Sequence, residues 1–258
     1  MDKKQILIVI GSYANTDAVR ETLPTILSEI AENDAALIVH DSTEKRHGQK
    51  EKWGYLREME EKHDFFLILS SNMSMAHARN MCLQLGQQLY LPDYIAVMED
   101  DHGFRPGFLG ELISTMKTYY GQVAPNGMRF GLFSGCASHR RAKDAQIAAS
   151  NHFSPRIDEK TDPGAIGGVN SCFRAAPAHH WNHVLIGYDT DEYLISTHQT
   201  KNLNFRNYHK GFTNMLVQGG DLMFDVDNES RGWSKGKMSG LWDNDYAASD
   251  PRAKFDKK

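Results

Sequence analysis

The sequence contains little cysteine: its three cysteines are Cys82, Cys136 and Cys172, and no two of them form a Cys-x-x-Cys pair. An odd number without such a pair fits neither a disulfide framework nor a structural zinc site. A reducing compartment is the simplest environment for this chain, so we expect a cytoplasmic protein. Because a Gly-x-Ser-x-Gly motif is also missing, we expect Cys136 to be a small buried residue rather than a nucleophile.

Long hydrophobic runs are missing as well. The densest runs, 6–10, 36–39, 65–69 and 94–98, are far shorter than the ~18 residues that a membrane-spanning helix needs. The first run ends at Gly11, which favours a buried strand over a signal peptide. We expect no transmembrane segment, and any membrane contact would be peripheral.

Neither sign of charge dominates, because 29 Lys+Arg stand against 33 Asp+Glu, a formal net charge of −4. The chain therefore has no global basic field to hold nucleic acid, and we expect no nucleic-acid partner. No internal repeat or low-complexity tract is present. With 40% hydrophobic and 24% charged residues, the composition is that of a folded globular protein and excludes collagen and disordered chains.

What the sequence does contain is an α/β pattern. The four apolar runs are bounded by polar or turn residues and alternate with helical periodicity, as buried parallel strands with crossover helices do. We expect the first helix to be kinked at Pro24 or to start near it, a later one to be capped by Ser74, and another to begin at Pro106. The segment between the second and third runs is expected to be a loop.

These elements predict one α/β domain with a mixed, mostly parallel central sheet flanked by helices. We place this domain at residues 1–224, with a first half at 1–120 and a second half at 121–224, which begins near a further strand predicted at 129–133. Residues 225–258 lack periodicity and are expected to form a mobile C-terminal tail or lid.

Three consecutive acids, Glu99, Asp100 and Asp101, follow the fourth apolar run. Because side chains alternate along a strand, Glu99 and Asp101 can converge while Asp100 points elsewhere. Two such carboxylates suit Mg²⁺ or Mn²⁺, and they lie at the edge where open α/β sheets bind ligands. Acids after a strand also serve simply to solvate a loop or cap the next helix, so the triplet alone leaves both interpretations open.

Four segments, in chain order, together resemble the GT-A nucleotide-sugar glycosyltransferases, particularly the family 2 enzymes of bacterial polysaccharide and capsule synthesis. They are strand 6–10 with Gly11-Ser12-Tyr13, strand 36–39 with His40-Asp41-Ser42-Thr43, the run from Ser71 to Ala78-Arg79-Asn80, and the stretch from Met98 to Leu109, which is similar to the DXD motif. The match covers about residues 5 to 120.

The resemblance implies a donor site made by the first half of the chain. Ser12 and Tyr13 would meet the nucleobase, Asp41 would touch the uracil or ribose, and Arg79 would lie near the nucleotide. Asp101 and Glu99 would hold Mn²⁺ or Mg²⁺, and Asp100 would help to bind the donor. Glu99 stands where the motif usually has its first aspartate, so Asp101 is the more dependable of the two metal ligands.

The second half and the tail would complete the site. The resemblance makes Asp191 the expected catalytic base and Asp189 the second choice, although an acid at this place can also be only a helix N-cap. Lys235 and Lys237 lie among glycines and serines that can fold over a diphosphate, unless they form a solvated tail. His209 is a weaker candidate for a further metal ligand.

The resemblance thus implies metal-dependent, inverting transfer of a sugar from a nucleotide-sugar donor, with a UDP-sugar expected, to a hydroxyl acceptor such as a glycan. A sugar nucleotidyltransferase is one alternative, but the glycine-rich Arg/Lys loop of such enzymes is missing after the first strand. A catalytically silent nucleotide- or carbohydrate-binding module is another. Glycosylation of modified DNA bases is disfavoured by the acidic charge balance. His179 and His180 have no metal-ligand spacing and are expected at the surface.

Overall fold

The structure is a computed structural model that describes residues 3–70, 73, 75–124, 127–135, 173–188, 203, 206–217 and 222–226. Strands and helices alternate through the first half, in the order β1 (Ile6–Ser12), α1 (Thr16–Glu32), β2 (Ala35–Asp41), η1 (Lys45–His47), α2 (Gln49–Lys62), β3 (Phe66–Leu69), α3 (Met75–Tyr90) and β4 (Tyr94–Glu99). The elements described after these are β5 (His102–Phe104), α4 (Phe108–Tyr119), β6 (Arg129–Ser134), β7 (Phe173–Pro177), α6 (Ala178–His180), the π-helical turn η4 (Trp181–Leu185), β8 (Phe212–Leu216) and β9 (Met223–Asp225).

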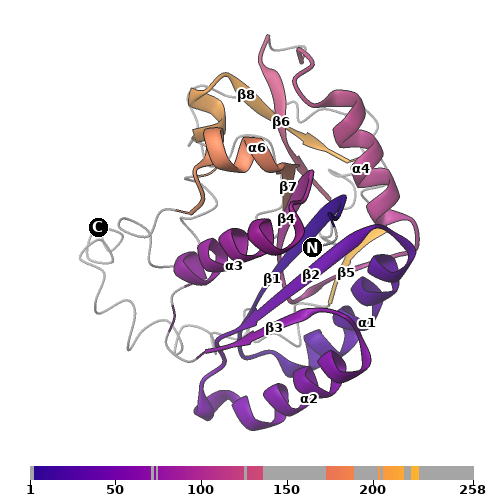
Figure 1. The fold of residues 1–258 in the computed structure, drawn as a ribbon, viewed down its shortest axis with the longest axis vertical. Coiled ribbons are helices and arrows are strands. Elements are labelled where there is room, and N and C mark those ends of the chain that lie inside the picture. The colour runs from indigo at the N-terminus through magenta and orange to yellow at the C-terminus, as the bar shows by residue number, and fades with distance from the viewer. Residues whose placement is uncertain are drawn as a thin grey trace, which may run out of the picture.

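A seven-stranded sheet in the order β3-β2-β1-β4-β7-β6-β8 forms the centre of the molecule (Figure 1). The strands β3, β2, β1 and β4 are parallel, β7 is antiparallel to β4 and β6, and β8 is parallel to β6. A second, two-stranded sheet pairs β5 with β9. The predicted α/β fold with a mixed, mostly parallel sheet is confirmed, and the carboxyl ends of β1, β2 and β4 meet at one edge.

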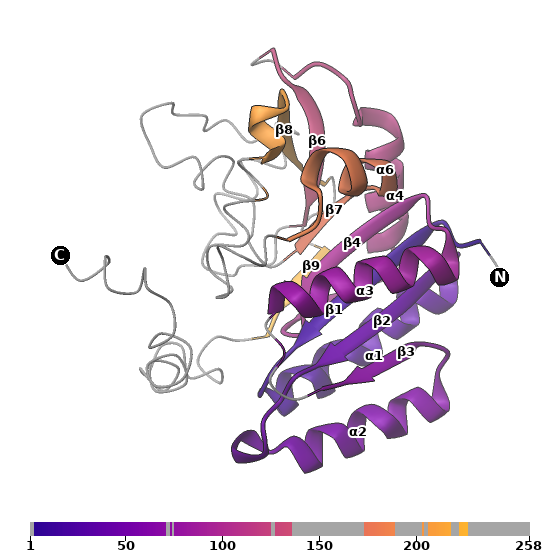
Figure 2. The same ribbon diagram turned by 60° about the vertical axis from the view of Figure 1, so that its left-hand side comes forward.

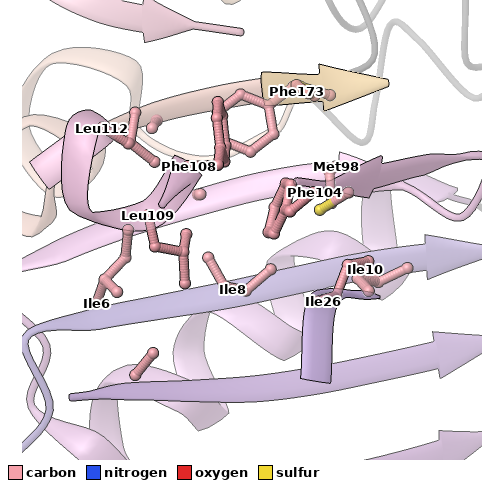
Figure 3. Packing of buried hydrophobic residues seen from close by; sticks show 14 of the residues in the cluster. Ile6, Ile8, Ile10, Ile26, Met98, Phe104, Phe108, Leu109, Leu112 and Phe173 are labelled. Carbon is pink, nitrogen blue, oxygen red and sulfur yellow. The ribbon is translucent and has the colours of Figure 1, made fainter. Parts of the chain in front are cut away.

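The central strands are buried on both faces, which explains their continuous apolar runs. In β1, Ile6, Ile8 and Ile10 enter the hydrophobic cluster that the sheet forms with α1 and α4, whereas Leu7 and Val9 enter the one that it forms with α3 and η4. Figure 3 shows the first cluster, in which residues of β1 and α1 lie near the phenylalanines around α4. Figure 2 shows α3 lying across the sheet on the side away from α1. The side chains of β1 thus pack alternately against the helices on the two faces of the sheet.

The segment between β2 and β3, predicted as a loop, is instead the helix α2 of 14 residues. Its sequence has a low hydropathy, and its only buried residues are Lys52 and Leu56. A helix that covers a sheet edge normally shows an apolar stripe with a period of 3.6 residues. Here a lysine occupies one of the buried positions, so the stripe does not stand out and the prediction was wrong.

Two helix starts also differ from those predicted. The first helix begins at Thr16, where Asn15 Oδ1 accepts a hydrogen bond from Ala18 N (3.2 Å), and it continues past Pro24 to Glu32. A start near Pro24 is therefore wrong. The helix α4 begins at Phe108 rather than at Pro106, because Gly107 has φ = 91° and interrupts the helical backbone there. Ser74, the expected cap of α3, lies outside the described residues.

A buried carboxylate replaces the missing side-chain cap of α4. Glu29 on α1 is 2% exposed, and its carboxylate accepts hydrogen bonds from Gly107 N (2.7 Å) and Leu109 N (2.9 Å). These N–H groups have no partner inside their own helix, and an anion is favoured at a helix N-terminus. Glu29 thereby fixes the start of α4 against α1, directly after the acidic triplet.

We expect the Glu29→Ala variant to lose about 3 kcal/mol of unfolding free energy, because two N–H groups lose a charged acceptor. Urea unfolding followed by circular dichroism measures this loss. Glu32→Ala, an exposed glutamate on the same helix, is the matched control and should change stability by no more than about 0.5 kcal/mol. Equal values for the two variants would contradict a capping role for Glu29.

Among the described residues, no helix combines the length and the apolar character needed to cross a membrane. Cys82 is a buried free cysteine on α3, whereas Cys136 and Cys172 lie outside the described residues. The predicted boundaries at residues 120 and 224 stay predictions.

Candidate functional site

Polar side chains collect where β1, β2 and β4 end. The strand register places Ser12 beside Asp41 and Gly11 beside Glu99. All three strands run in the same direction, so these residues lie at the same edge of the sheet, with Asp100 and Asp101 directly beyond. The described ends of β6 and β7, Ser134 and Phe173, reach this edge as well, because β7 pairs antiparallel with β4 and β6.

Asp41 is fully buried and holds a dense set of hydrogen bonds. Its Oδ1 accepts from Thr43 N (2.9 Å) and Trp53 Nε1 (2.7 Å), and its Oδ2 accepts from Thr43 Oγ1 (3.0 Å). Ser12 Oγ lies 2.8 Å and Lys52 Nζ 3.0 Å from the same Oδ2. Burial alone would raise the pKa of this carboxyl, but the Lys52 charge and the hydrogen bonds outweigh it, and the pKa is lowered. Asp41 is therefore a buried carboxylate anion.

Lys52 links Asp41 to the acidic triplet. Its side chain is 0% exposed, and Nζ lies 3.0 Å from Oδ2 of both Asp41 and Asp100. The Oδ2 atom of Asp100 also lies 2.7 Å from Ser12 Oγ and accepts a long hydrogen bond from Tyr13 N (3.3 Å). Burial and the neighbouring Asp101 raise the pKa of Asp100 against the opposite effect of Lys52. The ammonium of Lys52 thus contacts the carboxyl group of Asp41 at the end of β2 and that of Asp100 directly after β4.

The acids on either side of Asp100 have partners of their own. Arg79 Nη2 of α3 lies 3.3 Å from Glu99 Oε1, and Asp101 pairs with Nδ1 of the buried His102. The side chains of Glu99 and Asp101 are 30% and 14% exposed, so both are partly accessible to solvent. Their convergence on one cation stays a prediction. Within the part of the chain that the structure describes, no three potential metal-binding side chains form a group.

Arg79 and Asn80 join the acidic triplet to the segment that precedes the expected base. The Arg79 guanidinium lies over the Tyr188 ring, 5.2 Å from its centroid. Asn80 donates to Tyr188 O and accepts from Tyr188 N, both at 2.7 Å. Gly187 beside them has φ = 68°, and a Cβ there would lie 2.7 Å from Asn80 Oδ1, so glycine is required. The chain is thus held on α3 up to Tyr188, the residue before Asp189.

The other predicted site residues either lie outside the described residues or lie elsewhere in the fold. Asp189, Asp191, Lys235 and Lys237 lie outside the described ranges. His209 is exposed and precedes β8, whose start pairs with the start of β6, at the sheet edge opposite the acidic triplet. His180, expected at the surface, is 0% exposed, so that expectation was wrong.

Sequence reasoning missed Lys52 and Trp53, the two α2 residues in the network. Both were hidden because their helix was predicted as a loop, and nothing in the pattern around a single lysine distinguishes a buried ammonium from a solvated one. A lysine four residues before the buried Leu56, on the same helical face, is the signal that a correct helix assignment would have provided.

Comparison with models of protein families gives no match, and comparison with curated proteins gives none either. Solved structures do match. One is the mannosyltransferase PcManGT from Pyrobaculum calidifontis in complex with GDP-Man and Mn²⁺, with a TM-score of 0.57 and 14% identity over 87% of this chain and 57% of that one. Another is S. aureus TarS 1-349, with a TM-score of 0.59 and 7% identity over 88% of this chain and 62% of that one. The chain has the GT-A glycosyltransferase fold.

The same GT-A fold is matched by S. aureus TarS 1-349 in complex with UDP, with a TM-score of 0.57 and 7% identity over 86% of this chain and 60% of that one. The chain therefore spans between 57% and 62% of the length of these three structures. At such identities the likeness establishes the fold, and the expectation drawn from the sequence is confirmed at that level.

Proposed function

We propose that the protein is a glycosyltransferase that moves a sugar from a nucleotide-sugar donor to a hydroxyl acceptor. The observation that carries the proposal is the network at the carboxyl edge of the sheet, where Ser12, Asp41 and Asp100 are linked through Lys52 beside Arg79. Ligands of open α/β sheets bind at this edge. The solved neighbours support the proposal, because one is in complex with GDP-Man and Mn²⁺ and another with UDP.

We assign the nucleoside end of the donor to the ends of β1 and β2, with a UDP-sugar as the expected donor. Tyr13 and His47 form an edge-on ring pair with centroids 5.8 Å apart, and Tyr13 OH donates to Glu44 (3.3 Å). These partly buried groups offer the nucleobase of the donor an aromatic ring to pack against and a carboxylate that can accept a hydrogen bond. Ser12 and Asp41 lie behind them in the proposed site, and Arg79 faces the diphosphate.

Glu99 and Asp101 are the proposed ligands of Mn²⁺ or Mg²⁺. They fit a hard cation, because both are partly exposed acidic side chains on either side of Asp100, whose own carboxylate contacts Lys52. When bound, such a cation would neutralise charge on the departing nucleoside diphosphate. Arg79 contributes a positive charge of this chain's own at the same place, 3.3 Å from Glu99. Its pairing with Glu99 holds the guanidinium toward the edge where the diphosphate would leave.

We further propose an inverting reaction with Asp191 as the base and Asp189 as the second choice. The base takes the proton of the acceptor hydroxyl while the hydroxyl oxygen forms a bond to the anomeric carbon of the donor sugar. The bond between that carbon and the diphosphate oxygen breaks on the opposite side. The support is positional, since both acids follow Tyr188, which Asn80 holds beside Arg79. Lys235 and Lys237 are proposed to close over the diphosphate. A glycan is the proposed acceptor.

The test is nucleotide release from a panel of UDP-, GDP-, CMP- and dTDP-sugars in Mn²⁺, Mg²⁺ or EDTA, together with calorimetric titration of the free nucleotides. We expect slow release from one donor, a UDP-sugar, that EDTA lowers at least tenfold, because the metal stabilises the leaving group. Metal-dependent nucleotide binding without release from any donor would indicate a transferase that requires its acceptor, and turnover in the presence of an acceptor separates this case from a silent binding module. Absence of both would overturn the proposed function.

A further inference from the structure

Lys52 is unusual because its charged end is buried as completely as an apolar side chain. It is one of the largest fully buried side chains among the described residues, together with Trp181 and several phenylalanines. Removing an ammonium from water is unfavourable unless the charge is paired, and a methionine of similar length would fill the same space without that cost. We therefore infer that the ammonium does more than fill the space between α2 and the sheet.

The partners of Lys52 differ in how firmly they are held. Asp41 is fixed by its own surroundings, because Trp53 Nε1, Thr43 N and Thr43 Oγ1 all donate to it within 3.0 Å. Asp100 belongs to the turn after β4 and is 12% exposed. Asp41 and α2 thus hold the ammonium in place, and the ammonium in turn holds Asp100.

The direction of Asp100 has consequences for its neighbours in the chain. Glu99 is the last residue of β4, and Asp100 and Asp101 form the turn that follows, so the Asp100 side chain anchors the residue between the two proposed metal ligands. The backbone of the turn is tied as well, because Asp100 O accepts from Thr22 Oγ1 (2.7 Å) and Asp101 O accepts from Val226 N (3.0 Å). The Asp100 carboxylate is a third anchor of the turn, because its Oδ2 lies 2.7 Å from Ser12 Oγ and 3.0 Å from Lys52 Nζ and accepts from Tyr13 N (3.3 Å).

We propose that Lys52 is a positioning residue of the donor site, whose ammonium holds the Asp100 carboxylate against β1 and thereby aims Glu99 and Asp101 at the donor's metal. This inference rests on the proposed function and adds to it a residue from a helix that the sequence did not predict. Lys52 itself is buried beneath the site and touches neither donor nor acceptor.

The experiment compares Lys52→Met with the charge-balanced double variant Lys52→Met/Asp41→Asn. The single variant leaves two buried carboxylates with no shared cation, so a lower Tm is expected from it whatever its role. The double variant removes one negative charge with the positive one and is expected to regain most of the Tm. Lys62→Met, at an exposed lysine of the same helix, is the matched control and should equal the unaltered protein.

The readout is the factor by which Mn²⁺ tightens nucleotide binding, measured by calorimetry as the ratio of the UDP Kd in EDTA to the UDP Kd in Mn²⁺, with GDP tested in parallel. Loss of a nucleoside contact of Asp41 would weaken both Kd values alike and leave their ratio unchanged. If Lys52 positions Glu99 and Asp101, the ratio falls tenfold or more in the double variant although its Tm is restored.

Each outcome is decisive. A stable double variant that keeps the ratio of the unaltered protein overturns the positioning role and leaves the proposed function intact. If the unaltered protein binds neither nucleotide, the proposed function fails and this inference falls with it. If it binds nucleotide equally well with and without Mn²⁺, the proposed metal site and the role of Lys52 are overturned together. If the double variant melts as low as Lys52→Met, the Kd ratio is measured below that Tm, and the same criterion applies.

Discussion

Replacement of Asp101 by Asn is expected to lower metal-dependent nucleotide release on the order of 100-fold, the scale on which loss of one electrostatic stabiliser slows an enzyme. Asparagine keeps the shape of the side chain and one oxygen, so the turn after β4 can persist. It removes the negative charge that a hard cation requires at this place. Release of nucleotide from the donor that the panel identifies, measured over a series of Mn²⁺ concentrations, gives the effect.

The control for this variant is Asp93→Asn, one residue before the same strand begins. Asp93 is 50% exposed and pairs with Lys3 at 2.7 Å, at the sheet edge opposite the proposed site. We expect this change to leave nucleotide release within twofold of the unaltered protein. A smaller loss is expected for Glu99→Gln, because Glu99 stands where the DXD motif usually has its first aspartate and is the less dependable of the two proposed ligands. If Asp101→Asn and Asp93→Asn behave alike, Asp101 does not hold the metal.

Acidification from pH 6.5 to pH 4 is expected to cost the protein about 3 kcal/mol of unfolding free energy through His180 alone. Burial lowers the pKa of His180 to about 4 from its ordinary 6.5, with His179 acting in the same direction and the hydrogen bond to Asn207 acting against it. In the unfolded chain His180 binds a proton below pH 6.5, whereas in the folded chain it binds the proton only below about pH 4. The contribution of the neutral His180 to the unfolding free energy is therefore fully present above pH 6.5, and it is lost as the pH falls from 6.5 to 4.

The surroundings of His180 explain why the neutral ring is required. Its Nε2 lies 2.9 Å from Asn207 Oδ1 and its Nδ1 lies 3.2 Å from Tyr120 OH, while the Phe212 ring packs edge-on at 4.7 Å. In a neutral ring, Nε2–H donates to Asn207 and Nδ1 accepts from Tyr120. A second ring proton would place a positive charge at this fully buried position, where burial disfavours the charged ring.

Urea unfolding at half-unit steps from pH 7 to pH 4 measures this effect. The His180→Gln variant cannot take up the proton, so its stability should vary less over the window than that of the unaltered protein. Burial also lowers the pKa of His40, which acts in the same direction, and a residual slope is therefore expected in the variant. His63→Gln, an exposed histidine, should keep the full slope. An unchanged slope in His180→Gln would show that His180 is not the group responsible.

The strands and their order along the chain could be predicted from the sequence, because a strand buried on both faces is apolar at nearly every position. Such continuous apolar runs are rare in the other parts of the sequence. β1, β2, β4 and β6 lie within two residues of their predicted bounds. The acidic triplet could be found for the same reason, since charges that end an apolar run stand out. Its position at the sheet edge followed from strand direction alone.

The missing parts depend on residues far apart in the chain. Lys52 and Asp100 are separated by 48 positions, and His180 and Asn207 by 27. The sequence near Lys52 is that of a solvated, charged helix, and the sequence near His180 is that of a surface turn. Local periodicity cannot reveal that a distant aspartate or asparagine makes burial of such a group possible.

Local patterning in the sequence was therefore enough to define the α/β class, the strands and the edge at which carboxylates gather, because burial along one strand is written in that strand's own residues. The burial of Lys52, the inward turn of Asp100 and the neutral state of His180 were decided only when separate segments packed together. A charged or titratable side chain can leave water only where partners from elsewhere in the chain replace its hydration, and those partners are brought to it by the fold.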